Sequence, residues 1–138
     1  VPQNPVLWKF PKIVFPDISV KPRFCFDKTG AVVNGNCYWI CAQNEVEENL
    51  LLLIEGVCNS SIMTKYHDAK FTNKLYSGRR RYLSQYIEEY PIPNPDSDIS
   101  RQIVLLVDRI NNTSDGKEKD ILASEVDKLV ENAFGLTD

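Results

Sequence analysis

Residues 37–58 read CYWICAQNEVEENLLLLIEGVC, and the spacing of the apolar residues changes within this stretch. The first six residues are rich in aromatic and apolar side chains and favour a strand. Asn44 can cap a following helix, and Glu47 can bond back to the cap. Beyond the cap the apolar residues recur at helical spacing on one face: Val46, Leu50, Leu53, Ile54 and Val57. A strand followed at once by a helix predicts an α+β fold.

Further short strands are predicted upstream of this stretch. Residues 13–15 are apolar or aromatic, as are residues 24–26 after Arg23; both 13–15 and 23–26 favour strands, and residues 31–33 continue the pattern. The dipeptide Asn34-Gly35 can adopt the positive φ angles of a tight hairpin, with residues 37–42 as the returning strand. The pattern predicts a small mixed β-sheet or meander with helices packed on it.

The segment after the central helix has a weaker pattern. Ile62, Met63 and Tyr66 indicate a short second helix, and residues 68–81 have no clean period, which indicates a loop with some strand. Tyr82, Tyr86 and Tyr90 are spaced by four residues, which is typical of one packed helix face.

Two helices are predicted at the C-terminal end. Asp96, Ser97 and Asp98 are all suitable caps for the first, residues 111–116 form a break, and Gly135 suits a left-handed cap after the second. We therefore expect residues 1–95 to form a core with an extended N-terminal segment. Residues 96–138 are expected to form an antiparallel helix pair packed on that core, within one structural unit.

Composition limits the class of protein. The 138 residues carry 16 Lys plus Arg and 19 Asp plus Glu, with 43% hydrophobic residues, which is typical of one globular domain. Unbroken apolar runs such as residues 50–54 are far shorter than the ~20 residues of a membrane span, so no membrane partner is expected. The chain begins Val-Pro without a signal-peptide pattern, so we expect a piece of a longer cytoplasmic protein.

The four cysteines do not have the spacing of a metal site. Cys25, Cys37, Cys41 and Cys58 form no CxxC pair, and the last two lie among apolar residues. We expect buried free thiols in a cytoplasmic protein, with no metal ligands.

The formal net charge of −3 hides an uneven distribution. Residues 65–81 hold six basic residues and one acid, whereas residues 91–138 hold five basic and ten acidic residues. The basic segment also contains aromatic and amide side chains, a Ser77-Gly78 pair and consecutive arginines, which favour a nucleic-acid surface. The residues predicted to contact nucleic acid are Lys70, Asn73, Lys74, Tyr76, Ser77, Arg79, Arg80 and Arg81.

No catalytic residue is predicted. His67 is the one histidine, and its neighbour Asp68 points away from it on either a strand or a helix, so the pair forms no triad. The six glycines never approach the spacing of a dinucleotide or nucleoside triphosphate loop. By itself this chain is expected to bind rather than to catalyse.

Several short motifs follow one another in an order that resembles a known family. They are KIVFPDI (12–18), RF (23–24), VCNS (57–60) after the leucine-rich helix, KLYSGRRRYL (74–83), YPIP (90–93) and the closing EVDKLV (125–130) with FGLT (134–137). In this order the chain resembles the target-recognition (TaqI-like C-terminal specificity) domain of adenine-N6 DNA methyltransferases. Such domains occur in type II and type IIG restriction-modification proteins.

The resemblance implies sequence-specific recognition of double-stranded DNA. It implies an upstream methyltransferase domain in the same chain that binds S-adenosylmethionine, and an endonuclease in some parent enzymes. The family's Asn/Asp-Pro-Pro-aromatic motif, which holds the flipped adenine, is not matched here by Asn4-Pro5-Val6 or Asn94-Pro95-Asp96. The methyl-transfer site is therefore expected outside this segment, and no cofactor is expected within it. The lysines and arginines would contact phosphates, and Asn73, Tyr76 or Ser77 would reach base edges.

A different class of function also fits the charge pattern. The basic segment would then bind an acidic partner, and the acidic helical tail would be a docking surface, as in a protein-interaction module.

Overall fold

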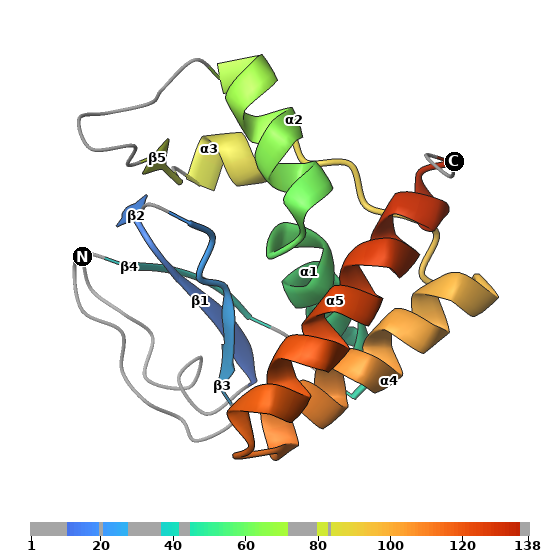
Figure 1. Cartoon of the computed structure of the whole chain (residues 1–138). Coiled ribbons are helices and arrows are strands. Elements are labelled where there is room, and N and C mark those ends of the chain that lie inside the picture. The colour runs from blue at the N-terminus through green and yellow to red at the C-terminus, as the bar shows by residue number, and fades with distance from the viewer. Residues whose placement is uncertain are drawn as a thin grey trace.

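The computed structural model describes residues 11–19, 21–27, 37–41, 45–71, 80–82 and 84–135. Within them a three-stranded antiparallel sheet has the order β3-β1-β4 (Figure 1). Its strands are β1 (Lys12–Pro16), β3 (Cys25–Asp27) and β4 (Cys37–Cys41). A separate antiparallel pair joins β2 (Ile18–Ser19) to β5 (Arg80–Arg81).

The α+β class is confirmed, but the strand order is not that of a meander. β4 pairs with β1 along its whole length, from Lys12 opposite Cys41 to Pro16 opposite Cys37. The first strand therefore occupies the centre, where Ile13 and Phe15 are buried. A hairpin signal is local, whereas the choice of partner depends on which strand can bury its side chains. Residues 31–36, which were predicted to form a strand and a turn, lie outside the described residues.

Five helices are described. They are α1 (Glu45–Cys58), α2 (Ser61–Phe71), α3 (Ser84–Ile87), α4 (Asp98–Asn112) and α5 (Gly116–Ala133). The last two lie side by side, as predicted for an antiparallel pair (Figure 1). The second helix is longer than its sequence pattern indicated, because its last turn adds Phe71, whose ring stacks on Tyr86. None of the described helices is long and apolar enough to cross a membrane.

The central helix α1 packs on several elements at once. It contacts β1 and β3 on the sheet side, α4 and α5 of the helix pair, and α2. Leu51, Leu52, Leu53 and Val57 are consequently all buried. The prediction of a single apolar face was therefore wrong. Leu51 and Leu52, outside that face, are buried because a helix packed between two layers buries more than one stripe, whereas Leu50 is exposed.

The helix ends have local causes. Ser97 caps α4, since its Oγ accepts from the Ser100 N–H at 3.2 Å, and Asp115 caps α5 by accepting from the Lys117 N–H at 3.0 Å. Gly135 has φ 74°, which confirms the predicted left-handed cap. Of the three residues predicted as possible caps of α4, Ser97 is the N-cap.

Gly56 permits the closest approach between α1 and α4. A Cβ at this position would lie 2.9 Å from Cγ2 of Ile103 and 2.9 Å from Cγ2 of Val107. Both are β-branched side chains on a helix, which have little freedom to move aside. The contact sets how near the helix pair lies to the rest of the core.

We predict that Gly56→Ala lowers the free energy of unfolding by ~1–3 kcal/mol, because the added methyl overpacks the helix crossing. Gly116→Ala is the matched control, since a Cβ there meets nothing within 4 Å. That variant should be as stable as the parent or slightly more stable. Urea unfolding compares the two variants, and equal stability of Gly56→Ala and the parent would contradict the proposed close contact.

Candidate nucleic-acid interface

The predicted nucleic-acid segment is held at both of its ends. On one side α2 runs to Phe71, and on the other β5 begins at Arg80. β5 is fixed by its pairing with β2 and by the Tyr82 N–H, which donates to the Asp17 carbonyl at 2.6 Å. Asn73, Lys74, Tyr76, Ser77 and Arg79 lie between these anchors and outside the described residues.

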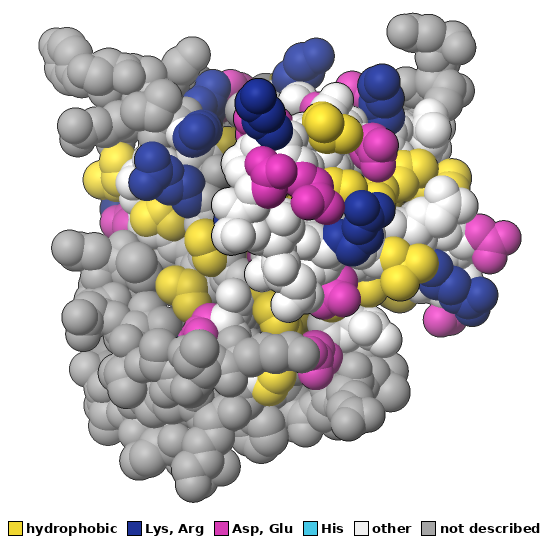
Figure 2. All heavy atoms as spheres, turned by 60° about the horizontal axis from the view of Figure 1, so that its bottom comes forward, with side chains coloured by type: hydrophobic (Ala, Val, Ile, Leu, Met, Phe, Trp, Pro, Cys, Tyr) yellow, Lys and Arg dark blue, Asp and Glu magenta, His cyan; other side chains and the backbone are white. Residues whose placement is uncertain are grey.

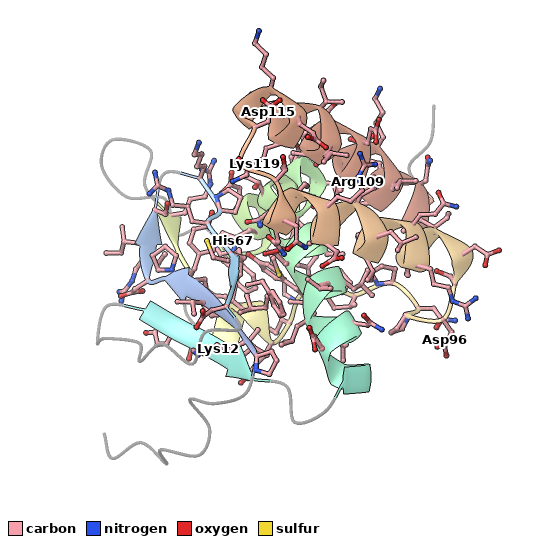
Figure 3. All side chains as sticks on the ribbon, turned by 90° about the horizontal axis from the view of Figure 1, so that it is seen from below. Lys12, His67, Asp96, Arg109, Asp115 and Lys119 are labelled. Atoms are coloured by element: carbon pink, nitrogen blue, oxygen red, sulfur yellow. The ribbon has the colours of Figure 1, made fainter. Side chains whose placement is uncertain are left out.

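His67 connects α2 to β5. Its Nε2 lies 2.9 Å from the Arg81 carbonyl oxygen, and its Nδ1 lies 2.6 Å from the Tyr90 hydroxyl. Because a carbonyl only accepts, Nε2 carries the proton, and Nδ1 accepts from Tyr90. The ring is fully buried in the interior of the molecule (Figure 3). Both ring nitrogens are thus engaged within the core, where they link α2 to β5 and to Tyr90.

Four aromatic rings surround His67. The ring centroids of Tyr82, Phe71, Tyr90 and Tyr86 lie 4.9, 5.1, 5.8 and 5.9 Å from that of the histidine. The three tyrosines were predicted to share one helix face, which was wrong because α3 covers only residues 84–87. They converge on His67 from a strand end, a short helix and a turn. Burial raises the pKa of Tyr82 to about 12.

Arg80 is engaged by Asp68 in a two-point ion pair. Its Nε lies 2.7 Å from Oδ1 and its Nη2 lies 2.9 Å from Oδ2 of that carboxylate. The hydrogen bonds to Asp68 raise the pKa of Arg80, and only 14% of its side chain is exposed. The pair joins α2 to β5 a second time, beside the link through His67.

The other two described candidates are more accessible. Lys70 is exposed, and its Nζ lies 3.2 Å from the Tyr66 hydroxyl and 3.6 Å from Oε1 of Glu89. The hydrogen bond to Tyr66 is the main cause of the raised pKa of Lys70. Arg81 is 44% exposed, with Nη2 3.5 Å from Oδ2 of Asp17. Figure 2 shows basic and acidic side chains interspersed over one face, with several basic ones together at its upper left.

An open groove of about 470 Å³ lies next to this region. It is lined by Lys21, Pro22, Asn59, Ser61, Thr64, Lys65, Asp68 and Arg80. Lys21 was not among the predicted contacts, because it lies in a proline-rich connector 44 residues before Lys65. The signal that could have drawn attention to it is the Lys21-Pro22-Arg23 sequence between two strands.

A second cavity, of about 300 Å³, borders β3 and contains the buried carboxylate of Glu55. Glu55 accepts from the Phe26 N–H at 2.9 Å and from the Asn111 side-chain amide at 3.0 Å. Asn59 accepts from the Phe24 N–H and donates to the Phe24 carbonyl, at 2.9 and 2.8 Å. Glu55 of α1 therefore binds the main chain of Phe26 in β3, and Asn59, just after α1, binds the main chain of Phe24, just before β3. Burial raises the pKa of Glu55 to about 7.

The described residues contain no cluster of three or more His, Cys, Asp or Glu side chains that could hold a metal ion. Cys58 is a free, buried thiol, and burial raises its pKa. Cys25 is exposed, so the expectation of a buried thiol was wrong there: it lies on the edge strand β3. The side chains of Cys37 and Cys41 lie outside the described residues.

Asn94 and Pro95, one of the two Asn-Pro pairs in the sequence, form a turn before α4. The Asn94 side chain accepts from the Asp96 N–H at 3.0 Å, and its carbonyl accepts from Ser97. This arrangement serves the entry into the helix.

Comparison with known proteins identifies the class of domain. The sequence profile of the TaqI-like C-terminal specificity domain matches residues 3–92, more than half of the chain. The chain belongs to this family. A curated relative, the type II methyltransferase M.BanIII of Aneurinibacillus aneurinilyticus, is 42% identical over 137 residues. The alignment covers 99% of this chain and 24% of that protein, so the chain spans about a quarter of its relative's length.

We predict that His67→Phe lowers the free energy of unfolding, because a phenyl ring fills the site but leaves the Arg81 carbonyl and the Tyr90 hydroxyl without their partner. A buried polar group left unsatisfied costs ~1–3 kcal/mol. Tyr90→Phe removes only one of the two hydrogen bonds and should cost less. Urea unfolding ranks the variants, and a His67→Phe protein as stable as the parent would show that the two hydrogen bonds do not hold β5.

The raised pKa of Glu55 should make the free energy of unfolding depend on pH. Its pKa in the folded protein is about 7, against 4.5 when unperturbed, so the folded state holds the proton more tightly. The stabilisation is fully present below pH 4.5 and is lost as the pH rises through about 7, a change of ~3 kcal/mol.

Glu55→Gln should remove that slope from unfolding measured between these pH values, whereas Glu125→Gln, on the exposed side of α5, should retain it. If the free energy of unfolding of Glu55→Gln changed with pH as it does in the parent, another group would be responsible for the pH dependence.

Proposed function

We propose that this chain recognises double-stranded DNA and selects the target site of an adenine-N6 DNA methyltransferase in a restriction-modification system. The observation that carries the proposal is the match of residues 3–92 to the specificity-domain family. The relative named a type II methyltransferase supports it over nearly the whole chain.

The chemistry of methyl transfer is assigned to a separate domain. The chain aligns with only 24% of its relative, which leaves most of that protein for other domains. The methyl donor of such an enzyme is S-adenosylmethionine, whose binding is assigned to the separate domain; Asn94, of one Asn-Pro pair, is used in a turn before α4. We expect the parent protein to act in the cytoplasm, on DNA held between this chain and the methyltransferase domain.

Recognition is divided between positioning and base reading. Lys70, Lys74, Arg79 and Arg81 are assigned to phosphates, which fix the register of the duplex without reading it. Asn73, Tyr76 and Ser77 are assigned to base edges in the major groove, where a good bidentate contact contributes ~1–3 kcal/mol of discrimination. Arg80, predicted from the sequence as one of these contacts, also holds the end of the segment through Asp68.

His67 and Asp68 of α2 hold β5, which begins where the proposed DNA-binding segment ends. Extruding an adenine from the duplex costs a few kcal/mol, and the bound duplex must be held in place while this happens. A segment tied to α2 through His67 and Asp68 keeps its contacts in position at both ends. The specificity domain thus supplies one wall of the DNA cleft.

We predict that Lys74→Glu and Arg79→Glu weaken binding of the full-length protein to cognate and non-cognate duplex alike. Each lost phosphate contact should lower the slope of log affinity against log salt by ~0.9. Fluorescence anisotropy with labelled duplexes at several salt concentrations measures both quantities. Arg80 is left intact because its removal would leave Asp68 without a bidentate partner.

Lys117→Glu, at the exposed start of α5, is the matched control and should bind as the parent does. Unchanged duplex binding by both test variants would contradict the proposal and would favour the protein-interaction module.

A further inference from the structure

We infer that the groove beside α2 is a second DNA contact, in which Lys21 and Lys65 bind a backbone phosphate. The inference rests on the proposed function and extends it to a connector that the basic segment does not include. Lys21 precedes β3, and Lys65 lies on α2, so the two lysines reach the groove from different elements.

The two lysines are available for a ligand. Both are exposed, and within the part of the chain that the structure describes neither forms an ion pair. A flexible ammonium group on a long side chain suits a phosphate, which it contacts as a point charge. Lys21 and Lys65 thereby differ from Lys70, Arg80 and Arg81, each of which has a carboxylate neighbour.

Among the described residues that line the groove, Asp68 is the acid, and its charge is paired. The Asp68 carboxylate receives both hydrogen bonds of the Arg80 pair, which offsets its charge. Asp127 of α5 lies next to Ser61 and accepts from its N–H at 2.7 Å and from its hydroxyl at 2.6 Å. This carboxylate occupies the start of α2, so an incoming phosphate is assigned to the lysines.

The position of the groove favours DNA over an acidic protein. Arg80 lines it and also ends the segment assigned to base reading, so one duplex can contact both regions. Lysine contacts of this kind bind the sugar-phosphate backbone and carry no sequence information. The groove is therefore a positioning contact that fixes the register of the duplex, while Asn73, Tyr76 and Ser77 read bases.

The test uses Lys21→Glu, Lys65→Glu and the double variant in the full-length protein. Lys119→Glu is the control: it is exposed near the start of α5 (Figure 3), eight residues, or about 12 Å along the helix, from Asp127. Binding to cognate and non-cognate duplexes is measured against salt concentration, together with methylation kinetics.

The double variant should bind both duplexes at least tenfold more weakly, with the ratio of their affinities unchanged and the salt slope reduced by ~0.9 for each lysine. The KM for DNA should rise while kcat stays as in the parent, and Lys119→Glu should behave as the parent. If Lys119→Glu lost DNA affinity to the same extent, the loss would be due to net charge alone, and the inference would be overturned.

Three further outcomes would overturn it. If the double variant binds duplex DNA as the parent does, while Lys74→Glu and Arg79→Glu weaken binding, the groove is no DNA contact and the proposed function stands. If the double variant loses binding only to a polyglutamate peptide, the groove belongs to an acidic protein partner. A parent protein that binds no duplex would overturn the proposed function together with the inference.

Discussion

The burial of α1 between the sheet and the helix pair is the constraint on which the other contacts depend. Leu51, Leu52, Leu53 and Val57 are removed from water together, which stabilises the fold through the hydrophobic effect. Gly56 lets α4 approach, and Glu55 holds the Phe26 main chain. This helix thus joins the sheet to the helix pair, and a change in its packing alters both the edge of the sheet and the position of the helix pair.

The turn after α1 fixes both of the elements that flank it. Asn59 binds both main-chain groups of Phe24, and the Ser60 hydroxyl accepts from the Met63 N–H at the start of α2. Two adjacent side chains therefore fix the strand on one side and start a helix on the other. The direction of α2 follows from this turn, and α2 in turn carries His67 and Asp68 to β5.

The proposed DNA surface depends on that helix more than on any strand. The buried link through His67 and the ion pair of Asp68 with Arg80 join α2 to β5, while Lys65 on the same helix faces the groove. Positioning contacts and base-reading contacts would then share one rigid support. A shared support suits an enzyme in which a small displacement of the duplex would move the target adenine away from the catalytic domain.

Sequence alone determined the α+β class, the C-terminal helix pair with its Ser97 and Gly135 caps, and the family, because these depend on local spacing and on the order of short motifs. It did not determine the strand order, the second buried face of α1 or the gathering of Tyr82, Tyr86 and Tyr90 around His67. Those features depend on which surfaces meet when distant segments pack, and the spacing of residues along the chain does not predict this. The groove is the same kind of feature: Lys21 and Lys65 are 44 residues apart in sequence and became neighbours through the turn at Asn59.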